Sequence, residues 1–508
     1  MAITVSYPGV YLQELDSGVR VIPGVPTSIT AFVGRARRGP TDTPVRIQGL
    51  GEFGRRFGAL WSEAPLGYSV THFFLNGGSD ALVVRVHAPS AAGADDRAFA
   101  DVPADGGTPL TLASANPGTW GNQLRASITH PSAGTAFHLT IQEVSPANPA
   151  QVVGEERFLN LTLTPGDSRF VSDVLLAESH MVTLDTLPAG RPQLTGLVSI
   201  PFTGGLDGQP VGASEVSDAG LAATRQGIYA LENADLFNLL CIPPFAPGSD
   251  PGQPTWDAAA AFCVGRRAML IVDPSPAWNE PDDVINGLGA HVTRSANAAL
   301  YFPRIRVSDP LKENRLETFA PSGAVAGVIA RIDAQRGVWK APAGQEATLN
   351  GVSELTVRLT DGQHGLLNPI GVDCLRTFPI AGRVVWGART LVGADELASQ
   401  WAYLPVRRTA LFIEESLFRG TQWVVFEPND EPLWSQIRLN VGAFMNGLFR
   451  KGAFQGTTPA QAYFVKCDRE SNPQEDIDRG IVNIIVGFAP LKPAEFVIIS
   501  IQQLRPAV

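Results

Sequence analysis

One stretch of glycines has the spacing of a dinucleotide-binding motif. Residues 49–54 read Gly-Leu-Gly-Glu-Phe-Gly, which fits GxGxxG, and they follow a strand-like segment. A dinucleotide fold also needs an acidic residue about 20 positions further on, at the end of the next strand. Residues 65–79 contain no Asp or Glu, and Asp80 precedes the next strand in place of ending it. The pattern therefore favours a glycine-rich turn between a strand and a helix over a nucleotide site.

A second candidate is a group of carboxylates, Asp273, Asp282 and Asp283. Paired carboxylates can serve as general acid and base. However, Asp273 is followed by proline at the end of an apolar strand, which is typical of a turn. The sequence contains no P-loop, HExxH, GxSxG or EF-hand pattern, and its seven histidines are scattered. We therefore expect no catalytic residue.

The cysteines are the remaining candidates for chemistry. Cys241, Cys263, Cys374 and Cys467 lie far apart, without a CxxC pair or a histidine at metal-binding spacing. This spacing favours reduced thiols in the core over a zinc site or a disulfide framework. We expect no cofactor and no metal.

A basic group accompanies an amphipathic helix near the C-terminus. Apolar residues recur with helical spacing from Trp434 to Leu448. Arg438, Arg450 and Lys451 lie on this helix or directly after it. They fit a solvated face and a cation-favouring helix C-terminus, or a basic contact to another protein. The residues alone leave both interpretations open.

Composition restricts the class of protein. The chain has 508 residues, 44% of them hydrophobic and 17% charged, so it is folded and is expected to contain two to four domains. The net charge of −10 argues against a nucleic-acid partner, which would require a basic face. The N-terminus has no basic and apolar leader, and no apolar run approaches the roughly 18 residues of a membrane span. We expect synthesis in a bacterial cytoplasm and no membrane insertion.

The elements that would position these residues suggest a mixed α/β, multidomain fold. Residues 1–25 form an N-terminal arm. Strand–helix alternation over 26–87 and again over 205–365 predicts one middle α/β domain. Residues 88–204 are rich in Ala, Pro, Gly, Ser and Thr, with short alternating strands, and predict an inserted β-rich outer domain. Residues 366–508 predict a C-terminal α/β domain ending in an extended strand, Glu495–Leu504.

Short runs of characteristic sequence occur along nearly the whole chain and are densest in its C-terminal third. They include Tyr7–Tyr11 (YPGVY), Ala31–Gly34 (AFVG), Pro117–Asn122 (PGTWGN), Ala299–Pro303 (ALYFP), Arg336–Ala343 (RGVWKAPA), Trp386–Thr390 (WGART), Phe426–Asn429 (FEPN) and Pro493–Phe496 (PAEF). These runs resemble one family, the sheath proteins of contractile phage tails and of related contractile injection systems. One departure from the family pattern is Asp373, where we expect Asn.

The resemblance implies a structural function. Such sheaths stack as six-fold rings around an inner tube, held extended on a baseplate and closed by a terminal cap. On triggering they shorten and drive the tube through a target envelope, powered by a metastable packing and not by nucleotide hydrolysis. The particle would be a phage virion tail or a phage-tail-like particle. The alternative from another class is an α/β enzyme, a hydrolase or a nucleotide-binding oxidoreductase.

The chain ends have a physical role in this interpretation. A terminal strand donated to the open sheet edge of a neighbour gains main-chain hydrogen bonds. Repeated head to tail, this donation builds an open helix of copies. The candidate residues are Tyr7, Val10, Tyr11 and Leu12 in the arm, and Phe496, Val497, Ile498, Ile499 and Ile501 in the last strand.

The resemblance also suggests where the inner tube binds. In such proteins the C-terminal domain faces the tube. By this likeness, the helix over 434–450 and the loop after it are the expected contact. Arg438, Arg450 and Lys451 would supply its charge.

Overall fold

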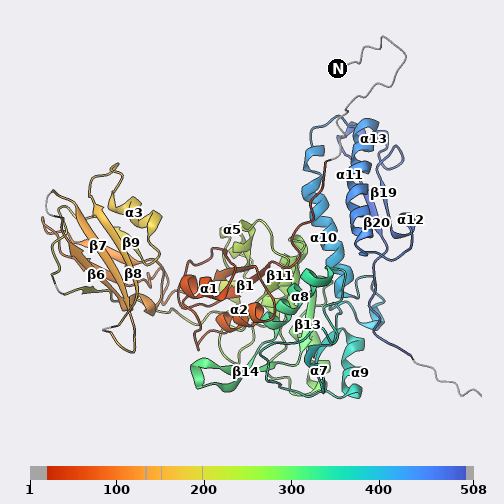
Figure 1. The fold of residues 1–508 in the computed structure, drawn as a ribbon, viewed down its shortest axis with the longest axis horizontal. Helices are drawn as coiled ribbons and strands as arrows, with labels where there is room; N and C mark the ends of the chain where they lie inside the picture. The colour runs from red at the N-terminus through yellow and green to blue at the C-terminus, as the bar shows by residue number, and fades with distance from the viewer. Residues whose placement is uncertain (1–19, 132–133, 150, 197, 499–508) are drawn as a thin grey trace, which may run out of the picture. The chain divides into compact units, whose positions relative to one another are not determined.

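The protein folds into two compact units, seen in a computed structural model that describes residues 20–131, 134–149, 151–196 and 198–498 (Figure 1). Among these residues, unit 1 holds 20–26, 336–341 and 405–498, and unit 2 holds 27–335 and 342–404. The chain therefore crosses between the units four times. The predicted mixed α/β, multidomain fold class is confirmed.

Unit 2 is built on an eight-stranded sheet with the order β18-β17-β13-β12-β11-β1-β3-β2. The six inner strands are parallel, and the edge strands β2 and β18 are antiparallel to their neighbours. Strands β1, β3, β11, β12 and β13 are buried along their whole length, which explains their continuous apolar sequences. The strands are β1 (Thr30–Gly34), β2 (Val45–Ile47), β3 (Ala81–Arg85), β11 (Leu239–Cys241), β12 (Met269–Val272), β13 (Ala298–Phe302), β17 (Val372–Phe378) and β18 (Gly382–Val385).

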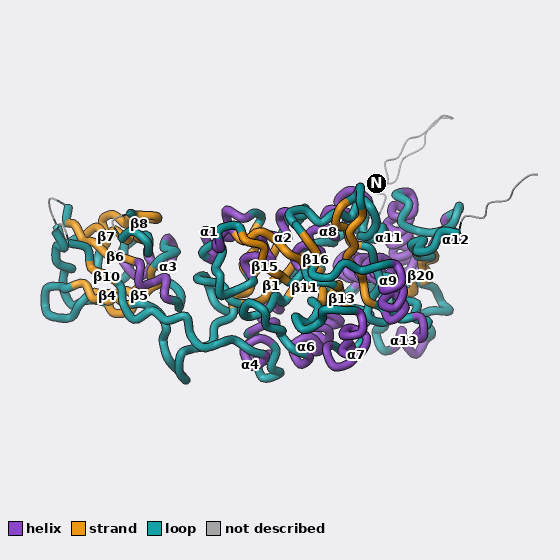
Figure 2. Tube along the Cα trace, turned by 90° about the horizontal axis from the view of Figure 1, so that it is seen from below, coloured by secondary structure: helices purple, strands orange, loops and turns teal. Residues whose placement is uncertain are grey.

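Helices cover both faces of this sheet. Figure 2 shows α6 and α7 on one side and α2 and α8 on the other. Trp256 of α6 and Val284 of α7 join the core on the first side, with alternate strand residues such as Val33 and Leu300. The helices of unit 2 outside the inserted domain are α1 (Leu50–Phe57), α2 (Leu66–Leu75), α4 (Ala213–Val216), α5 (Leu221–Thr224), α6 (Gln253–Gly265), α7 (Pro281–His291), α8 (Ser322–Arg336) and α9 (Asp361–Leu367).

Two glycines let α8 approach α2 closely. A Cβ on Gly323 would lie 2.2 Å from the carbonyl oxygen of Ser69, and one on Gly327 would lie 2.4 Å from that of Phe73. Real Cβ atoms do not come this close, so both positions require glycine. Beside this pair lies a three-stranded sheet of β15 (Arg315–Phe319), β14 (Ile305–Asp309) and β16 (Glu354–Leu355).

The inserted region folds around its own core. Its two sheets have the orders β4-β5-β9 and β10-β6-β7-β8, with α3 (Val171–Glu178) packed on β8 and β9. Trp120, Phe137 and Phe202 lie in the core between them. The strands are β4 (Phe99–Val102), β5 (Leu110–Ser114), β6 (Leu124–Thr129), β7 (Phe137–Val144), β8 (Val152–Leu161), β9 (Val182–Thr186) and β10 (Ile200–Pro201).

Unit 1 is a helical hairpin beside a small sheet. Helices α10 (Leu404–Gly420) and α11 (Glu431–Arg450) are its main elements. The core includes Trp434, Ile437, Val441 and Met445, which form the predicted apolar face of α11. The remaining elements are α12 (Pro459–Ala462), α13 (Gln474–Asp478), β19 (Tyr463–Lys466) and β20 (Ile485–Phe488).

Two features of this region differ from expectation. The sequence of Trp423–Phe426 predicts a strand, but this segment is a 3₁₀ turn over Gln422–Val424 followed by a tight turn, so the prediction is wrong. The predicted boundary at residue 366 also differs from the division into units, which falls between residues 404 and 405. The physical reason is that β17 and β18, after residue 366, extend the sheet of unit 2.

Within the described ranges, no helix combines the length and apolarity needed to cross a membrane.

Candidate assembly surfaces

The small sheet of unit 1 has only two strands. Strand β19 pairs with β20 in antiparallel register, with Tyr463 opposite Phe488 and Lys466 opposite Ile485. In the part of the chain that the structure describes, each strand therefore has one edge without a strand partner. Isolated two-stranded sheets are marginally stable, and an open edge presents unpaired main-chain groups. An edge of this kind can pair with a further strand.

The two faces of this sheet differ in character. Tyr463, Val465, Val486 and Phe488 pack against the core of unit 1. On the other face, Phe464 is 56% exposed and Ile485 46% exposed. The outward face thus has an apolar part beside Lys466, so an added strand would find side-chain contacts as well as hydrogen bonds.

The predicted terminal strands fall mostly outside the described residues. Tyr7, Val10, Tyr11 and Leu12 lie there, as do Ile499 and Ile501. Phe496, Val497 and Ile498 are described. They belong to no strand and are 77%, 80% and 90% exposed.

Residues 20–25, which follow the predicted donated segment, are held on unit 1. The backbone N–H of Arg20 donates to Oδ1 of Asn440 at 2.9 Å, and its guanidinium lies 4.7 Å from the ring centroid of Trp423. Further along, Ile22 packs at Gly420, and the N–H of Val25 donates to Oγ of Ser416 at 3.2 Å. This part of the predicted arm thus follows α10, which sequence patterns did not indicate, since the contacts are about 400 residues apart in sequence.

The three basic residues predicted to contact the tube do not form one cluster. Arg438 pairs with Glu431 at 2.6 Å and donates to the carbonyl oxygen of Cys467, next to the end of β19. Arg450 and Lys451 are exposed at the opposite end of α11. Burial raises the pKa of Tyr463, and the charge of nearby Arg450 opposes that rise. The structure thus places the basic residues near both ends of β19.

The loop between α10 and α11 contains the Phe-Glu-Pro-Asn sequence. The side chain of Asn429 donates to the carbonyl oxygen of Ile481 at 2.9 Å and accepts from Nε1 of Trp434 at 2.8 Å. Asp430 caps α11 by accepting from the N–H of Leu433 at 3.3 Å. These contacts fix the loop to α11 and to the segment before β20.

The glycine pattern at 49–54 forms the predicted turn. Helix α1 begins at Leu50, directly after the antiparallel edge strand β2. A dinucleotide site requires a parallel strand at this point. The pattern therefore has a structural explanation.

The carboxylates do not gather into a site. Asp273 is buried and accepts from the N–H and Oγ of Ser322, both at 2.8 Å, at the start of α8. Its burial raises its pKa to about 6. Asp283 instead accepts from the N–H groups of Asn279 and Glu280 at the start of α7. Among the described residues, no group of three or more His, Cys, Asp or Glu side chains could hold a metal ion.

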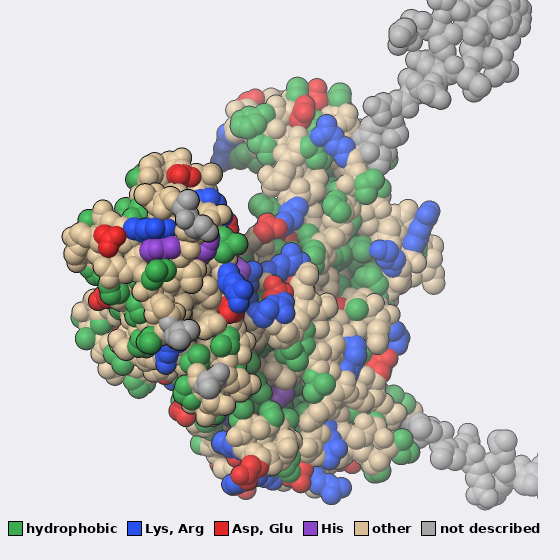
Figure 3. Space-filling view, turned by 60° about the vertical axis from the view of Figure 1, so that its left-hand side comes forward, with side chains coloured by type: hydrophobic (Ala, Val, Ile, Leu, Met, Phe, Trp, Pro, Cys, Tyr) green, Lys and Arg blue, Asp and Glu red, His purple; other side chains and the backbone are tan. Residues whose placement is uncertain are grey.

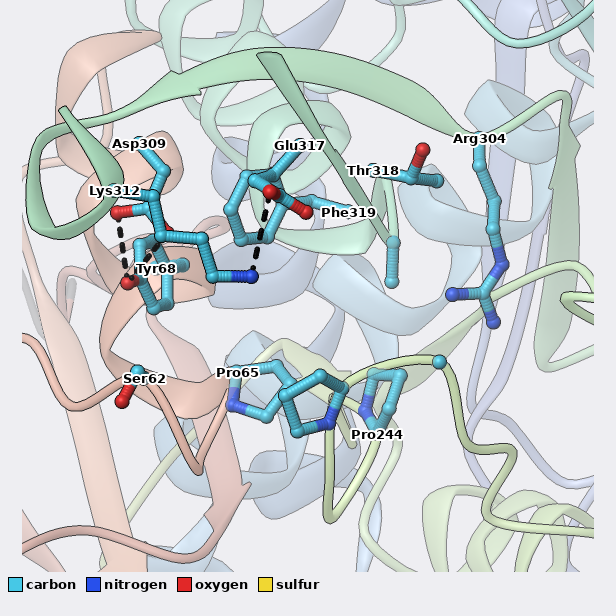
Figure 4. Close-up of a pocket in the computed structure, with 13 residues that line it drawn as sticks. Ser62, Pro65, Tyr68, Pro244, Arg304, Asp309, Lys312, Glu317, Thr318 and Phe319 are labelled. Atoms are coloured by element: carbon cyan, nitrogen blue, oxygen red, sulfur yellow. Dashed lines mark hydrogen bonds and ion pairs between the residues drawn. The ribbon is translucent and has the colours of Figure 1, made fainter. Parts of the chain in front are cut away.

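A pocket in unit 2 lies between α2 and the β14–β15 hairpin (Figure 4). Tyr68 donates to the carboxylate of buried Asp309 at 2.9 Å, and Lys312 pairs with Glu317 at 3.3 Å. Burial and this carboxylate raise the pKa of Tyr68. The neutral phenol and the paired charges suit a structural role, because neither pair presents an activated acid or base.

One face of the molecule carries charges of both signs. On the face drawn in Figure 3, Asp and Glu side chains lie among the Lys and Arg side chains. A phosphate-binding surface would instead concentrate basic residues. Open strand edges in unit 1 and the exposed apolar residues Phe496, Val497 and Ile498 are typical of proteins that assemble with partners.

Two family models match the chain. The central domain of phage tail sheath proteins matches residues 222–391, and the phage tail sheath C-terminal domain matches residues 396–503, together more than half of the chain. The tail sheath protein of Burkholderia phage BcepMu is 23% identical over 500 residues, covering 96% of this chain and 94% of the phage protein. The chain belongs to the phage tail sheath family.

Solved structures share the fold. The sheath complex of an extracellular contractile injection system, PVC, in its contracted state has a TM-score of 0.61 at 21% identity, with 99% of each chain covered. A chain in the six-fold symmetrised baseplate of the anti-feeding prophage has a TM-score of 0.56 at 21% identity, covering 98% of this chain and 99% of that one.

Proposed function

We propose that this chain is the subunit of a contractile sheath. Copies stack as six-membered rings around an inner tube, and the sheath shortens to drive the tube through a target envelope. The observation that carries the proposal is the open β19–β20 sheet, in the same unit as residues 20–26 and 496–498.

Strand donation connects the copies. The segment around Tyr7, Val10, Tyr11 and Leu12 and the segment Phe496–Ile501 each add to a free edge of β19 or β20 in a neighbour. Main-chain hydrogen bonds supply affinity, and the apolar outward face of the sheet supplies side-chain contacts. Head-to-tail donation is heterologous, so it produces an open helix and not a closed dimer.

The energy for shortening is stored during assembly as a metastable packing. No nucleotide is hydrolysed, and the function is structural, not catalytic. In support, the glycine motif is a strand-to-helix turn and Asp273 holds the start of α8.

The inner tube binds the helical hairpin of unit 1. Arg450 and Lys451 are the exposed cations for this contact. Arg438 contributes mainly by holding α11 against the end of β19, because its guanidinium already engages Glu431 and the Cys467 carbonyl.

The particle is a phage tail or a phage-tail-like particle, assembled in a bacterial cytoplasm. Its other partners are baseplate and terminal cap proteins, a proposal that the likeness to the anti-feeding prophage baseplate chain supports. The inserted domain, residues 88–204, forms the outer part and the C-terminal domain the inner part.

Deletion of residues 1–14 tests the proposal. The deletion variant should remain a folded monomer, with a circular dichroism spectrum and melting temperature close to those of the intact chain. It should form no hollow, ridged cylinders in negative-stain microscopy when expressed with the tube protein, whereas the intact chain should form them. Normal cylinders from the deletion variant would refute strand donation by the arm.

A thermal-shift experiment separates this function from that of a nucleotide-binding enzyme. Ligand that binds the folded state raises the melting temperature by mass action. With ATP or NAD at millimolar concentration, we expect no shift. A concentration-dependent rise would instead support a nucleotide site.

A further inference from the structure

The loop between α10 and α11 contains a tight turn with an unusual residue in it. The N–H of Glu427 donates to the carbonyl oxygen of Val424 at 3.2 Å. Val425 has φ −66° and ψ 131°, and Phe426 has φ +71°. These values match the two central positions of a type II β-turn. The second of them is normally glycine or asparagine, because φ is positive there.

Phe426 is therefore doubly unfavourable in a single copy. A bulky side chain at positive φ is strained, since its Cβ crowds the backbone. The ring is also fully exposed, so it gains nothing from burial. Val425 beside it is 58% exposed. Glycine would relieve the strain and expose no apolar ring.

The residues on either side of this turn make contacts within the same copy. Asn429 joins Trp434 to Ile481, and Asp430 caps α11. Trp423 stacks against Arg20. These contacts hold the turn rigidly and leave the ring of Phe426 projecting outward. A strained, projecting aromatic ring on a rigid support is typical of an interface anchor.

The chain itself indicates which partner lies near this ring. The described chain begins at Arg20, in contact with Trp423, three residues before Phe426. The eight residues from Leu12 to Arg20 span at most about 27 Å when extended. By the proposed function, on which this step rests, Val10–Leu12 pair with a neighbouring copy. That copy must therefore come within this distance of Arg20.

We infer that Phe426 is an anchor residue that inserts into an apolar socket on an adjacent copy of this chain. The turn presents the ring, and the segment before Arg20 brings the receiving copy to it. The residue is kept at the strained position because the interface between copies buries it.

The substitution Phe426→Gly tests this inference in the full-length chain. The melting temperature of the monomer should stay the same or rise, because glycine suits the turn. The concentration needed for cylinder formation with the tube protein, measured by sedimentation, should rise at least about tenfold. A gain in stability with a loss of assembly cannot arise from misfolding.

The substitution Ala59→Gly is a matched control. Ala59 is exposed and has φ +59°, so glycine relieves similar strain there without removing a ring. This variant should assemble like the wild type. A photo-reactive benzoylphenylalanine in place of Phe426 should give adducts between a tagged and an untagged copy.

The outcomes are distinct. Wild-type assembly of Phe426→Gly, or adducts only to the tube protein or only within one copy, would overturn the inference. Failure of the wild-type chain to assemble would overturn the proposed function and this inference with it.

Discussion

The ring of Phe464 occupies the space above Gly487. The two residues are directly opposite each other on β19 and β20. A Cβ on Gly487 would lie 2.2 Å from a ring carbon of Phe464. The glycine therefore lets the ring lie flat across the outward face of the sheet.

Replacement of Gly487 by valine should displace this ring. Crowding of this kind destabilises by about 1–3 kcal/mol, and urea unfolding followed by tryptophan fluorescence would measure it. Since the outward face would also become uneven, cylinder formation should be weakened.

Gly447→Ala is the control, because nothing lies within 4 Å of a Cβ at Gly447 on α11. That variant should be slightly more stable, by roughly 0.5–1 kcal/mol. Unchanged stability in Gly487→Val would contradict this description of the sheet.

The substitution Asn429→Ala should destabilise unit 1. It leaves Nε1 of buried Trp434 and the carbonyl oxygen of Ile481 without the partner they have now. Each unsatisfied group costs about 1–3 kcal/mol, so we expect a loss of about 2–4 kcal/mol in the free energy of unfolding. Gln436→Ala, at an exposed position of α11, should cost less than about 0.5 kcal/mol. Equal effects of the two substitutions would show that Asn429 has no special role.

Asp273 should make the stability of unit 2 depend on pH. Burial raises its pKa to about 6, above its ordinary value of 3.8, so the fold favours the protonated carboxyl. Relative to higher pH, the protonated Asp273 adds roughly 3 kcal/mol to the free energy of unfolding. This stabilisation is present below pH 4 and is lost as the pH rises from about 4 to 6. Asp273→Asn keeps a neutral acceptor for Ser322 at every pH. The variant should therefore become more stable relative to the wild type as the pH rises over this range. Parallel stability curves for the two proteins would contradict the prediction.

Reversal of charge at Arg450 and Lys451 should weaken co-assembly with the tube protein. Exposed charges attract a partner over a range that salt shortens to about 8 Å at physiological ionic strength. The double substitution to glutamate should therefore reduce co-sedimentation most strongly at low salt, with a smaller difference at 0.5 M NaCl. Arg479→Glu, at an exposed position after α13, is the control and should co-sediment normally. Loss of tube binding in Arg479→Glu alone would indicate that the tube contacts α13 and not the end of α11.

Patterns local in sequence predicted the elements well. The apolar run at Ala298–Phe302, within the strand–helix alternation predicted for 205–365, is a buried strand, and the residues with helical spacing from Trp434 to Leu448 form the buried face of α11. Both depend on residues close together in the chain. The resemblance likewise depended on short runs such as Trp386–Thr390 and Phe426–Asn429, and it identified the family.

Features that depend on distant partners could not be predicted. The β-branched and aromatic residues from Trp423 to Phe426 favour a strand, but they form turns, and Trp423 lies against the distant Arg20. The role of Gly327 appears only when α2 lies against α8. Nothing in the sequence of β17 indicates that it pairs with β13, whose paired residues lie 72 positions earlier, as in Leu300 and Val372.

Unit 1 holds the described beginning of the chain at Arg20 and its described end at Ile498. The residues next to both proposed donor segments therefore belong to the same body as the two strand edges proposed to accept them. In a sheath connected by donated strands, mechanical tension would pass from one copy of unit 1 to the next. Unit 2 and its inserted domain would not carry this tension. The eight-stranded sheet could then change its neighbours during shortening while the connected network of unit 1 bodies stays intact.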